Sequence, residues 1–477
     1  MTTNVENATM KVEVSIGEAV DKLSILNIKL KNIEDPIKIN EIKKEIESLN
    51  ECGVYISKYP MYYNMMIYVN EQIWNKTDLI KIIGIKPDAV NREYAAIAHS
   101  IFELNQQRFR IKNFFNILCN SNIKEQKSYA STRCHITIKN EDILYDKLAY
   151  INYLTIQYDV VTFNFNECNE GEIIKDAIKR IFYAPNIVIN SENLLLPNGE
   201  PVPITHEINL SNVDDELGNM DIFEFEPIRY AAGGMFGDFI HSLSIINEIF
   251  YKTGRKGLLY ISDKNGGDIW RFGILETYQD TYSVIKSQKY IKDYKIYESG
   301  QIDINLNDWR KNPLLFSVPL YESYNFAYKS THGVTWGERP WLNVKINPIY
   351  SNILIINTTN YRWAENINFN KLISEHKECC GNKNGDDVPD VLFLSSNDDS
   401  QYKHFIATTG INIPTILANT FQEMCTIIAS CKLFAGSASG PMAIATAFDK
   451  KRIIGTPNTV DRLLSKPFTA NGIEGFL

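Results

Sequence analysis

An aspartate and a histidine near the middle of the chain are the residues best suited to chemistry. Asp238 and His241 lie three positions apart within residues 230–250, YAAGGMFGDFIHSLSIINEIF, where a short apolar strand turns into a helix with regularly spaced apolar residues. That spacing puts both side chains on one face of the first helical turn. A carboxylate and an imidazole held over a ligand can do general acid–base work. The plainer alternative is that Asp238 caps the helix and His241 packs against its neighbours.

Three glycines form the turn that leads into this helix. Gly233, Gly234 and Gly237 let a ligand or a facing domain come close to the backbone, because glycine has no side chain. The helix start adds N–H groups without helical partners and a positive potential, which suit an anion. We therefore expect the three glycines to belong to the same binding site as the aspartate and the histidine.

A second helix start, near the C-terminus, has the composition of a phosphate-binding turn. The strand predicted at 432–435 is followed by GSASGP, which contains Ser437, Ser439, Gly440 and Pro441. These residues combine hydroxyl groups, small side chains and a proline suited to the first helical position. The turn lacks the Gly-Lys-Ser/Thr ending of a P-loop. An ordinary tight turn between a strand and a helix explains the same residues equally well.

A third polar loop follows the apolar segment ILIIN at 353–357. It contains Asn357, Thr358, Tyr361 and Arg362, and Arg362 supplies a positive charge of the kind that a diphosphate needs. In open parallel sheets, ligands bind beyond the carboxyl ends of the strands, where this loop and the GSASGP turn are both expected. The sequence thus predicts one anion site built from separate loops.

These loops belong to a chain whose pattern changes along its length. Residues 1–130 show helical spacing of apolar residues and predict a helical bundle domain. Residues 131–220 include a segment rich in β-branched and aromatic residues at 151–164, which favours strands, and predict a small α+β connector. Residues 221–345 and 346–477 alternate strand, loop and helix, which is typical of doubly wound α/β domains with parallel sheets.

Polar residues interrupt the apolar pattern of the predicted bundle. Asp21, Lys22, Asn105, Arg108 and Lys112 are more than a plain bundle needs. A solvated face is the simpler explanation. A protein partner that binds through the helical domain is the alternative.

The composition is that of an ordinary soluble globular protein, with 44% hydrophobic and 22% charged residues in a chain of 477. A net charge of −8 argues against a general nucleic-acid binder. No apolar run reaches the roughly 18 residues of a membrane span, and the N-terminus shows no secretory signal pattern. The eight cysteines form no paired CxxC motifs, so we expect no structural zinc and a reducing, cytoplasmic location.

Residues 223–462 resemble the heptosyltransferase-like branch of the GT-B glycosyltransferases. The resemblance rests on four short motifs in the same order, which are Gly237-Asp238 with His241-Ser242-Leu243, Pro340-Trp341-Leu342, residues 357–362, and LANTFQEMCTIIASCKLFAGSASGPMAIATAF at 417–448. It implies a GT-B-like fold of two Rossmann-like domains with the site between them. It also implies a nucleotide-sugar donor and a glycan or glycoconjugate acceptor.

By the same resemblance, Asp238 is the general base of an inverting, hexosyl- or heptosyltransferase-like enzyme. Ser437, Ser439 and Gly440 would receive the diphosphate of the leaving group as its charge develops. The resemblance implies neither a cofactor nor a metal, and the chain contains no DxD motif.

Two departures from that family leave other functions open. Heptosyltransferases carry an acidic residue where this chain has Ala438 and a histidine where it has Ala443, which argues against a heptose donor. The alternatives are a catalytically inactive protein that binds a sugar nucleotide or a glycan, and a sugar-nucleotide epimerase of the related two-domain type.

The N-terminal part carries a separate resemblance. Residues 14–30, VSIGEAVDKLSILNIKL, and residues 104–129, LNQQRFRIKNFFNILCNSNIKEQKSY, are similar to an uncharacterised helical domain found near bacterial surface-glycan genes. This resemblance implies a glycan setting and supplies no mechanism.

Overall fold

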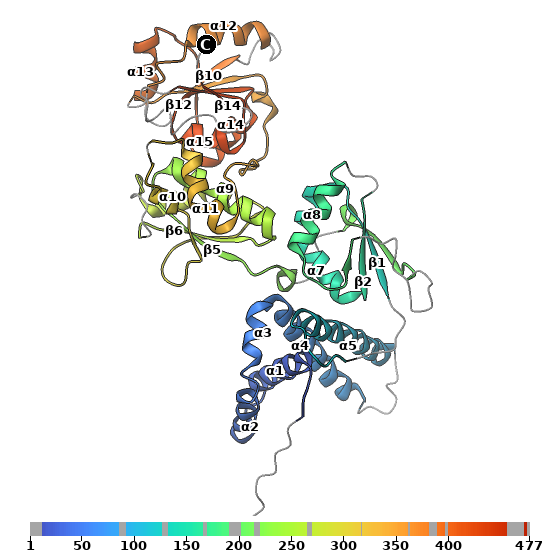
Figure 1. Ribbon diagram of the computed structural model, residues 1–477. Helices are drawn as coiled ribbons and strands as arrows, with labels where there is room; N and C mark the ends of the chain where they lie inside the picture. Colours follow the sequence, from blue (N-terminus) through green and yellow to red (C-terminus); the bar gives the residue numbers. More distant parts are fainter. Residues whose placement is uncertain are drawn as a thin grey trace, which may run out of the picture. The chain divides into compact units, whose positions relative to one another are not determined.

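The computed structural model divides into two compact units, Met1–Glu226 and Pro227–Leu477, which we call unit 1 and unit 2. Figure 1 shows the helices and strands of each unit. The structure describes residues 12–84, 92–125, 132–165, 169–189, 202–213, 220–264, 270–315, 317–360, 363–380, 389–395, 399–455 and 472–474.

Unit 1 begins with helices, as the apolar spacing predicts. They are α1 (Ile16–Asn32), α2 (Pro36–Glu47), α3 (Cys52–Lys58), α4 (Pro60–Gly84) and α5 (Arg92–Leu118). Two residues separate α1 from α2 by starting the second helix. Asp35 caps α2 by accepting hydrogen bonds from the N–H groups of Ile37 and Lys38, and Pro36 lies in the first turn. The two longest helices, α4 and α5, pack against each other and against α1.

Of the polar residues expected on a solvated face, Lys22 is exposed, but Asp21 and Lys112 are buried. The Asp21 side chain on α1 is 1% exposed and accepts hydrogen bonds from Arg108 of α5, the shortest at 2.5 Å, and from Asn70 of α4. Lys112 is also buried and pairs with Glu18 at 2.9 Å. Buried charges are tolerated when they are paired and hydrogen-bonded, so these residues join three helices.

A four-stranded sheet completes unit 1, and it corrects the prediction of an α+β connector. Its pairings are all parallel, in the order β3-β2-β1-β4, so this segment is α/β. Only the last residues of the segment 151–164 form a strand, and the first form the helix α7. There Ile151, Leu154 and Ile156 are buried, and such packing overrides local β-propensity. The elements are β1 (Arg133–Thr137), α6 (Glu141–Asp146), α7 (Leu148–Gln157), β2 (Val160–Asn164), α8 (Gly171–Ile181), β3 (Ile187–Val188) and β4 (His206–Asn209), followed by the 3₁₀ turns η2 (Leu210–Asn212) and η3 (Met220–Phe223).

Unit 2 contains two parallel sheets, and the first has the strand order β7-β6-β5-β8. The predicted glycine turn links β5 to α9. The stretch 303–328 contains a strand, a 3₁₀ turn and most of a helix. The elements are β5 (Ile228–Ala232), α9 (Phe236–Thr253), β6 (Gly257–Ile261), α10 (Ile274–Lys286), β7 (Ile291–Ile296), β8 (Ile304–Asn305), η4 (Asp308–Lys311) and α11 (Leu320–His332).

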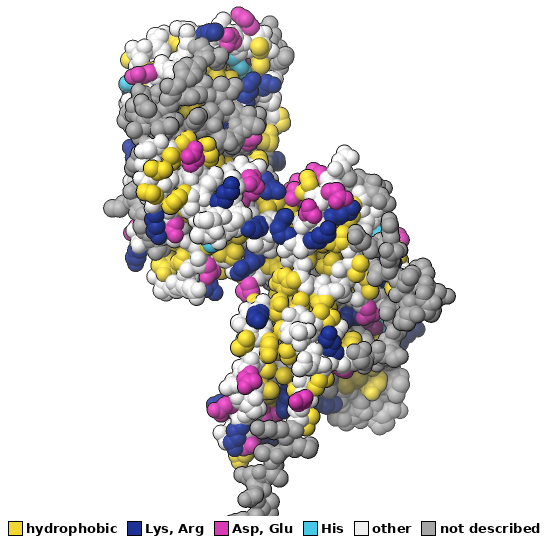
Figure 2. All heavy atoms as spheres, in the orientation of Figure 1, with side chains coloured by type: hydrophobic (Ala, Val, Ile, Leu, Met, Phe, Trp, Pro, Cys, Tyr) yellow, Lys and Arg dark blue, Asp and Glu magenta, His cyan; other side chains and the backbone are white. Residues whose placement is uncertain are grey.

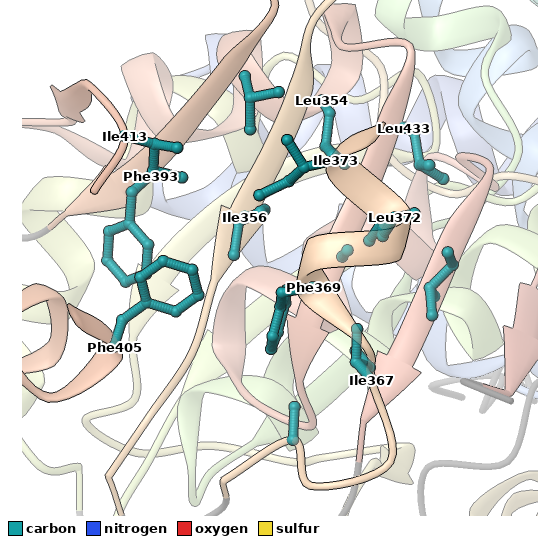
Figure 3. Packing of buried hydrophobic residues seen from close by; sticks show 14 residues of the cluster. Leu354, Ile356, Ile367, Phe369, Leu372, Ile373, Phe393, Phe405, Ile413 and Leu433 are labelled. Carbon is teal, nitrogen blue, oxygen red and sulfur yellow. The ribbon is translucent and has the colours of Figure 1, made fainter. Parts of the chain in front are cut away.

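The second sheet of unit 2 has the order β11-β10-β9-β12-β13-β14, and every pairing is parallel, as the alternation of strands and helices predicts. Its core is shown in Figure 3, where Phe369, Leu372 and Ile373 of α12 lie over Leu354 and Ile356 of β9. After η5 (Pro348–Tyr350), the elements are β9 (Leu354–Asn357), α12 (Phe369–Cys380), β10 (Val391–Ser395), α13 (Ser400–Thr409), β11 (Thr415–Leu417), α14 (Phe421–Ser430), β12 (Leu433–Ser437), α15 (Gly440–Ala447), β13 (Arg452–Gly455) and β14 (Gly472–Glu474).

Residues 336–342 form a strap that ties α9 to α15. The Trp341 indole N–H donates to the carbonyl of Ile240 in α9 at 2.7 Å, and its backbone N–H donates to the carbonyl of Ala447 in α15 at 2.9 Å. Farther along α9, Arg339 pairs with Glu248 at 3.1 Å. Because the strap bonds to both helices, it fixes one against the other.

The described residues include no helix with the length and apolar character needed to cross a membrane. On the face of the molecule in Figure 2, the coloured Lys and Arg side chains are interspersed with those of Asp and Glu. Both signs of charge therefore share this face.

Candidate functional site

A cavity of about 650 Å³ lies in unit 2, between the start of α9 and the start of α15. Its volume is in the range of pockets that hold small-molecule ligands. The wall combines residues of both sheets' helices and loops, among them Gly237 and Asp238 from the first, and Asn357, Ser439 and Gly440 from the second. The carboxyl ends of β5, β9 and β12 all lead into it, as expected for parallel sheets.

The two helix starts touch each other at this cavity. A Cβ added at Gly440 would lie 3.0 Å from the ring of Phe236, and one added at Gly237 would lie 3.9 Å from the Cβ of Ala443. Neither helix is capped by the side chain of its own N-cap residue. Two sets of N–H donors and two positive helix ends therefore meet at one place, which suits an anion.

Asp238, in the first turn of α9, lines the cavity and is ion-paired. Its Oδ2 lies 2.5 Å from a guanidinium nitrogen of Arg310, and the two side chains are 25% and 22% exposed. The backbone carbonyl of Asp238 accepts a hydrogen bond of 3.1 Å from the Tyr324 hydroxyl. Arg310 is on η4, which follows β8, and it also lines the cavity. The Asp238 carboxylate thus lines the cavity while it is paired with Arg310. The sequence pattern around Asp238 did not indicate this cation.

His241 lines the cavity as well, but it cannot supply positive charge there at neutral pH. Burial lowers its pKa to about 3, and the nearby Arg452 adds to the effect. The ring packs against Trp336 and Trp341, with ring centroids 5.5 and 6.3 Å away. Its backbone carbonyl accepts a hydrogen bond of 2.9 Å from the Trp336 indole. The imidazole is therefore neutral and held by the strap.

The loop after β9 brings polar atoms to the opposite wall. Asn357 and Thr359 line the cavity, and the Asn357 amide is fixed because its Nδ2 donates to the carbonyl of Leu394 at 2.9 Å. Within the part of the chain that the structure describes, Asn357 Oδ1 and Thr359 Oγ1 are buried without a hydrogen-bond partner. Such groups are costly unless something binds them, so they are available to a ligand.

The structure brings together part of the predicted set of site residues. Those that line the cavity are Gly237, Asp238, His241, Asn357, Ser439, Gly440 and Pro441. Buried residues that are not part of the cavity wall are Gly233, Gly234, Thr358 and Ser437. Of these, Ser437 has a supporting position, because its Oγ accepts a hydrogen bond of 3.0 Å from the Thr359 N–H. The predicted residues Tyr361 and Arg362 lie outside the described residues.

One wall of the cavity was not predicted at all. It includes Trp270, Arg271 and the α10 residues Glu276 and Asp280. Asp280 accepts a hydrogen bond of 2.9 Å from the backbone N–H of Phe421 and so caps the start of α14 from another helix. Glu276 and Asp280 are four residues apart in α10, and that spacing, which puts them on one face of a helix, is the signal that the sequence holds for this wall.

The charge of the cavity wall is mixed. Among the described wall residues, the cations are Arg271 and Arg310, and the acids are Asp238, Glu276 and Asp280. No group of three or more His, Cys, Asp or Glu side chains within the described ranges is arranged to hold a metal ion. An anionic ligand would therefore find its counter-charges in the arginines and the two helix starts.

Comparison with known families gives one match, in unit 1. Residues 10–141 match a family of unknown function, DUF6165. None of the curated proteins compared with the chain matches it. The matched family has no described activity, so the surface-glycan setting expected for this part of the chain remains an expectation.

Several solved structures of glycosyltransferases are similar to part of the chain. Heptosyltransferase II of E. coli is 14% identical and aligns over 52% of this chain and 89% of its own, with a TM-score of 0.31. The iron-containing dodecameric glycosyltransferase TibC of enterotoxigenic E. coli is 14% identical, over 52% and 62%, with a TM-score of 0.35. A family 9 glycosyltransferase of Veillonella parvula is 14% identical, over 72% and 85%, with a TM-score of 0.25. At these TM-scores the likenesses establish neither a common fold nor a function.

Proposed function

We propose that unit 2 is a glycosyltransferase that moves a sugar from a nucleotide-sugar donor to a hydroxyl group of a glycan or glycoconjugate. The observation that carries this proposal is that Asp238 and the uncapped helix start at Ser439 and Gly440 line one cavity. A carboxylate beside an anion site is what such a transfer requires, because a proton is removed on one side of the anomeric carbon and a diphosphate leaves on the other.

In the proposed reaction, the acceptor oxygen attacks the anomeric carbon while Asp238 takes the proton of the acceptor hydroxyl. The bond between the anomeric carbon and the diphosphate oxygen breaks, and its electron pair leaves with the diphosphate. The N–H groups at the start of α15 and the guanidinium of Arg310 stabilise that charge. Direct attack inverts the anomeric configuration. We assign the charge stabilisation to these protein groups and not to a metal.

The two sheets of unit 2 give this proposal its architecture. We assign residues 221–345 to an acceptor-side domain and residues 346–477 to a donor-side domain, in a GT-B-like arrangement of two Rossmann-like halves. Asn357 and Thr359 on the donor side offer buried oxygens without partners in the described residues, which suit donor hydroxyl groups. His241 is assigned a positioning role, because a neutral ring held by Trp336 cannot neutralise a phosphate.

The test is turnover of nucleotide sugars by the purified protein. We expect hydrolysis or transfer from at least one donor in a panel of UDP-, GDP-, ADP-, CDP- and dTDP-sugars. Asp238→Asn should lower the rate by about 100-fold or more, the usual contribution of a general base, with the fold retained by circular dichroism. Asp293→Asn is the matched control, since Asp293 is also ion-paired, with Lys295 at 2.7 Å, but does not line the cavity. An equal loss in both variants would remove Asp238 from the mechanism.

A second candidate is a protein that binds sugar nucleotides without turning them over. Ala438 and Ala443 favour it, because both line the cavity at positions where heptosyltransferases carry an acid and a histidine. Thermal-shift measurements with nucleoside diphosphates separate the two candidates. Stabilisation without turnover of any donor would favour the binding protein, and the absence of any stabilisation would contradict both candidates.

A further inference from the structure

The contact between Asp238 and Arg310 has a consequence for the order of events at the site. Asp238 Oδ2 and the Arg310 guanidinium are 2.5 Å apart, and both residues belong to the wall of the cavity that also contains Ser439 and Gly440. A carboxylate oxygen in a charge-assisted hydrogen bond is engaged with a donor. A general base needs that oxygen for the acceptor's proton. The oxygen that Arg310 holds becomes available for that proton only when this contact loosens.

Arg310 and the backbone of Asp238 both contact one pair of aromatic residues, Trp309 and Tyr324. The guanidinium lies over the Trp309 ring, 4.6 Å from the centroid. Trp309 in turn stacks on Tyr324, at 5.2 Å and 22° between the ring planes, and the Tyr324 hydroxyl holds the backbone carbonyl of Asp238 at 3.1 Å. Tyr324 thus holds the backbone of Asp238, and the face of Trp309 attracts the Arg310 guanidinium through a cation–π contact.

A diphosphate entering the cavity would compete with Asp238 for this guanidinium. Arginine binds phosphate through two parallel hydrogen bonds, and a diphosphate carries more charge than one carboxylate. Of the cations on the described wall, Arg310 is the one paired with Asp238, whereas Arg271 lies against the exposed ring of Phe272 at 5.6 Å. If the diphosphate binds the guanidinium nitrogen that contacts Asp238, that nitrogen leaves the carboxylate.

We propose that Arg310 senses the donor: it holds Asp238 until a nucleoside diphosphate group enters the cavity, then transfers to that group and releases the carboxylate. This proposal rests on the function proposed above. Donor binding then frees the Asp238 oxygen that Arg310 held. That oxygen can accept the proton of the acceptor hydroxyl once a donor is present. Arg310 is then both a ligand of the leaving group and a positioning residue for the base.

The consequence that can be measured is a competition, because Asp238 lowers the affinity of the site for a diphosphate by occupying Arg310. The experiment measures the dissociation constants of UDP, ADP, GDP, CDP and dTDP by calorimetry for the full chain and continues with the tightest of them. Asp238→Asn should bind it about 3- to 10-fold more tightly, and Arg310→Gln about 10-fold or more weakly, as for a lost charged hydrogen bond. In the double variant the gain from Asp238→Asn should disappear.

The double variant separates this competition from simple repulsion between Asp238 and the ligand. Repulsion acts whether or not Arg310 is present, so its relief would persist, or grow, in the Arg310→Gln background. Arg271→Gln is the matched control, because it removes a wall cation that is not paired with Asp238, and there the gain from Asp238→Asn should be retained. Arg310→Lys keeps the charge, so it should restore part of the lost affinity and exclude a general folding defect.

The outcomes also distinguish this inference from the proposed function. If the unmodified protein binds none of the five diphosphates, the proposed function fails and the inference fails with it. If it binds one, the inference alone is overturned by any of three results: no gain in Asp238→Asn, a gain that persists without Arg310, or unchanged affinity in Arg310→Gln. The proposed function would survive each of those three.

Discussion

At the scale of single residues, Gly436 sets how closely β12 approaches β9 beside the cavity. A Cβ at this position would lie 1.7 Å from the backbone oxygen of Asn357, so any other residue must push the two strands apart. Asn357 lines the cavity, and Ser437, next to the glycine, holds the N–H of Thr359. The absence of a Cβ at Gly436 therefore determines both the pairing of β12 with β9 and the position of the loop that follows β9.

Gly436→Ala should consequently lower the free energy of unfolding of unit 2 by about 2 kcal/mol or more, as overpacking against a backbone atom does. It should also weaken nucleoside diphosphate binding, because the Asn357 loop moves. Urea unfolding followed by tryptophan fluorescence measures the first effect, since all tryptophans except Trp74 lie in unit 2.

Gly237→Ala is the matched control for that substitution. Its Cβ would make only an ordinary contact, at 3.9 Å from Ala443, so we expect a change in unfolding free energy within about 0.5 kcal/mol. Equal losses in the two alanine variants would contradict the close approach at Gly436.

At the scale of elements, α9 contains a buried glutamate, Glu248, which contacts Arg339 in the strap of residues 336–342. The Glu248 side chain is 3% exposed, and it accepts hydrogen bonds from the backbone N–H of Arg339 at 3.0 Å and from the Arg339 guanidinium at 3.1 Å. Burial raises the pKa of Glu248 to about 7, with Glu338 adding to the rise and Arg339 opposing it. The helix that presents Asp238 is thus attached to the strap through a group that titrates near neutral pH.

The sign of the pH effect follows from linkage. Because the pKa of Glu248 rises from 4.5 to about 7 on folding, the folded protein binds this proton more tightly than the unfolded chain does. Its contribution to stability is fully present below pH 4.5 and is lost as the pH rises through about 7. Glu248→Gln should remove this dependence, so that the difference in unfolding free energy between the two proteins changes by about 3 kcal/mol across that range.

Thermal unfolding of the protein and of Glu248→Gln at half-unit pH steps would measure the effect. Glu375→Gln on α12 is the matched control, because Glu375 is about half exposed and makes only a distant pair with Lys371 at 3.7 Å. The control should follow the pH profile of the unmodified protein. Parallel profiles for all three proteins would refute the assignment to Glu248.

At the scale of the whole molecule, every described residue of the cavity wall belongs to unit 2. We therefore expect residues 227–477, expressed alone, to fold and to bind the nucleoside diphosphate that the full chain binds, with a dissociation constant within about twofold. Residues 1–226 should not bind it. Calorimetry on both fragments and on the full chain provides the measurement. A fragment 227–477 that is folded by circular dichroism yet binds nothing would show that the site needs unit 1.

Unit 1 has its own buried ionic network and its own parallel sheet, and it contains the segment that matches the family of unknown function. The buried position of Asp21 and Lys112 removes them from any exposed partner surface. A protein partner for the helical part of unit 1 remains a proposal, as do the domain boundaries at residues 130 and 345.

Patterns that depend on near neighbours could be read from the sequence. The apolar segment at β9 and the glycine turn before α9 are set by residues a few positions apart, and local sterics and hydrogen bonds act over that range. The same local signals indicated Asp238 and the turn at Ser439 and Gly440 as site residues, and these residues do line the cavity.

What the tertiary structure decided are the contacts between distant segments. Arg310 meets Asp238 across 72 positions, and no local spacing connects them. Burial decided that residues 151–157 form helix and not strand, that Asp21 is inside a bundle and not on its surface, and that His241 is neutral. The physical reason is common to all of them: burial, charge pairing and dielectric surroundings depend on which segments the fold brings together, and a short stretch of sequence does not contain that information.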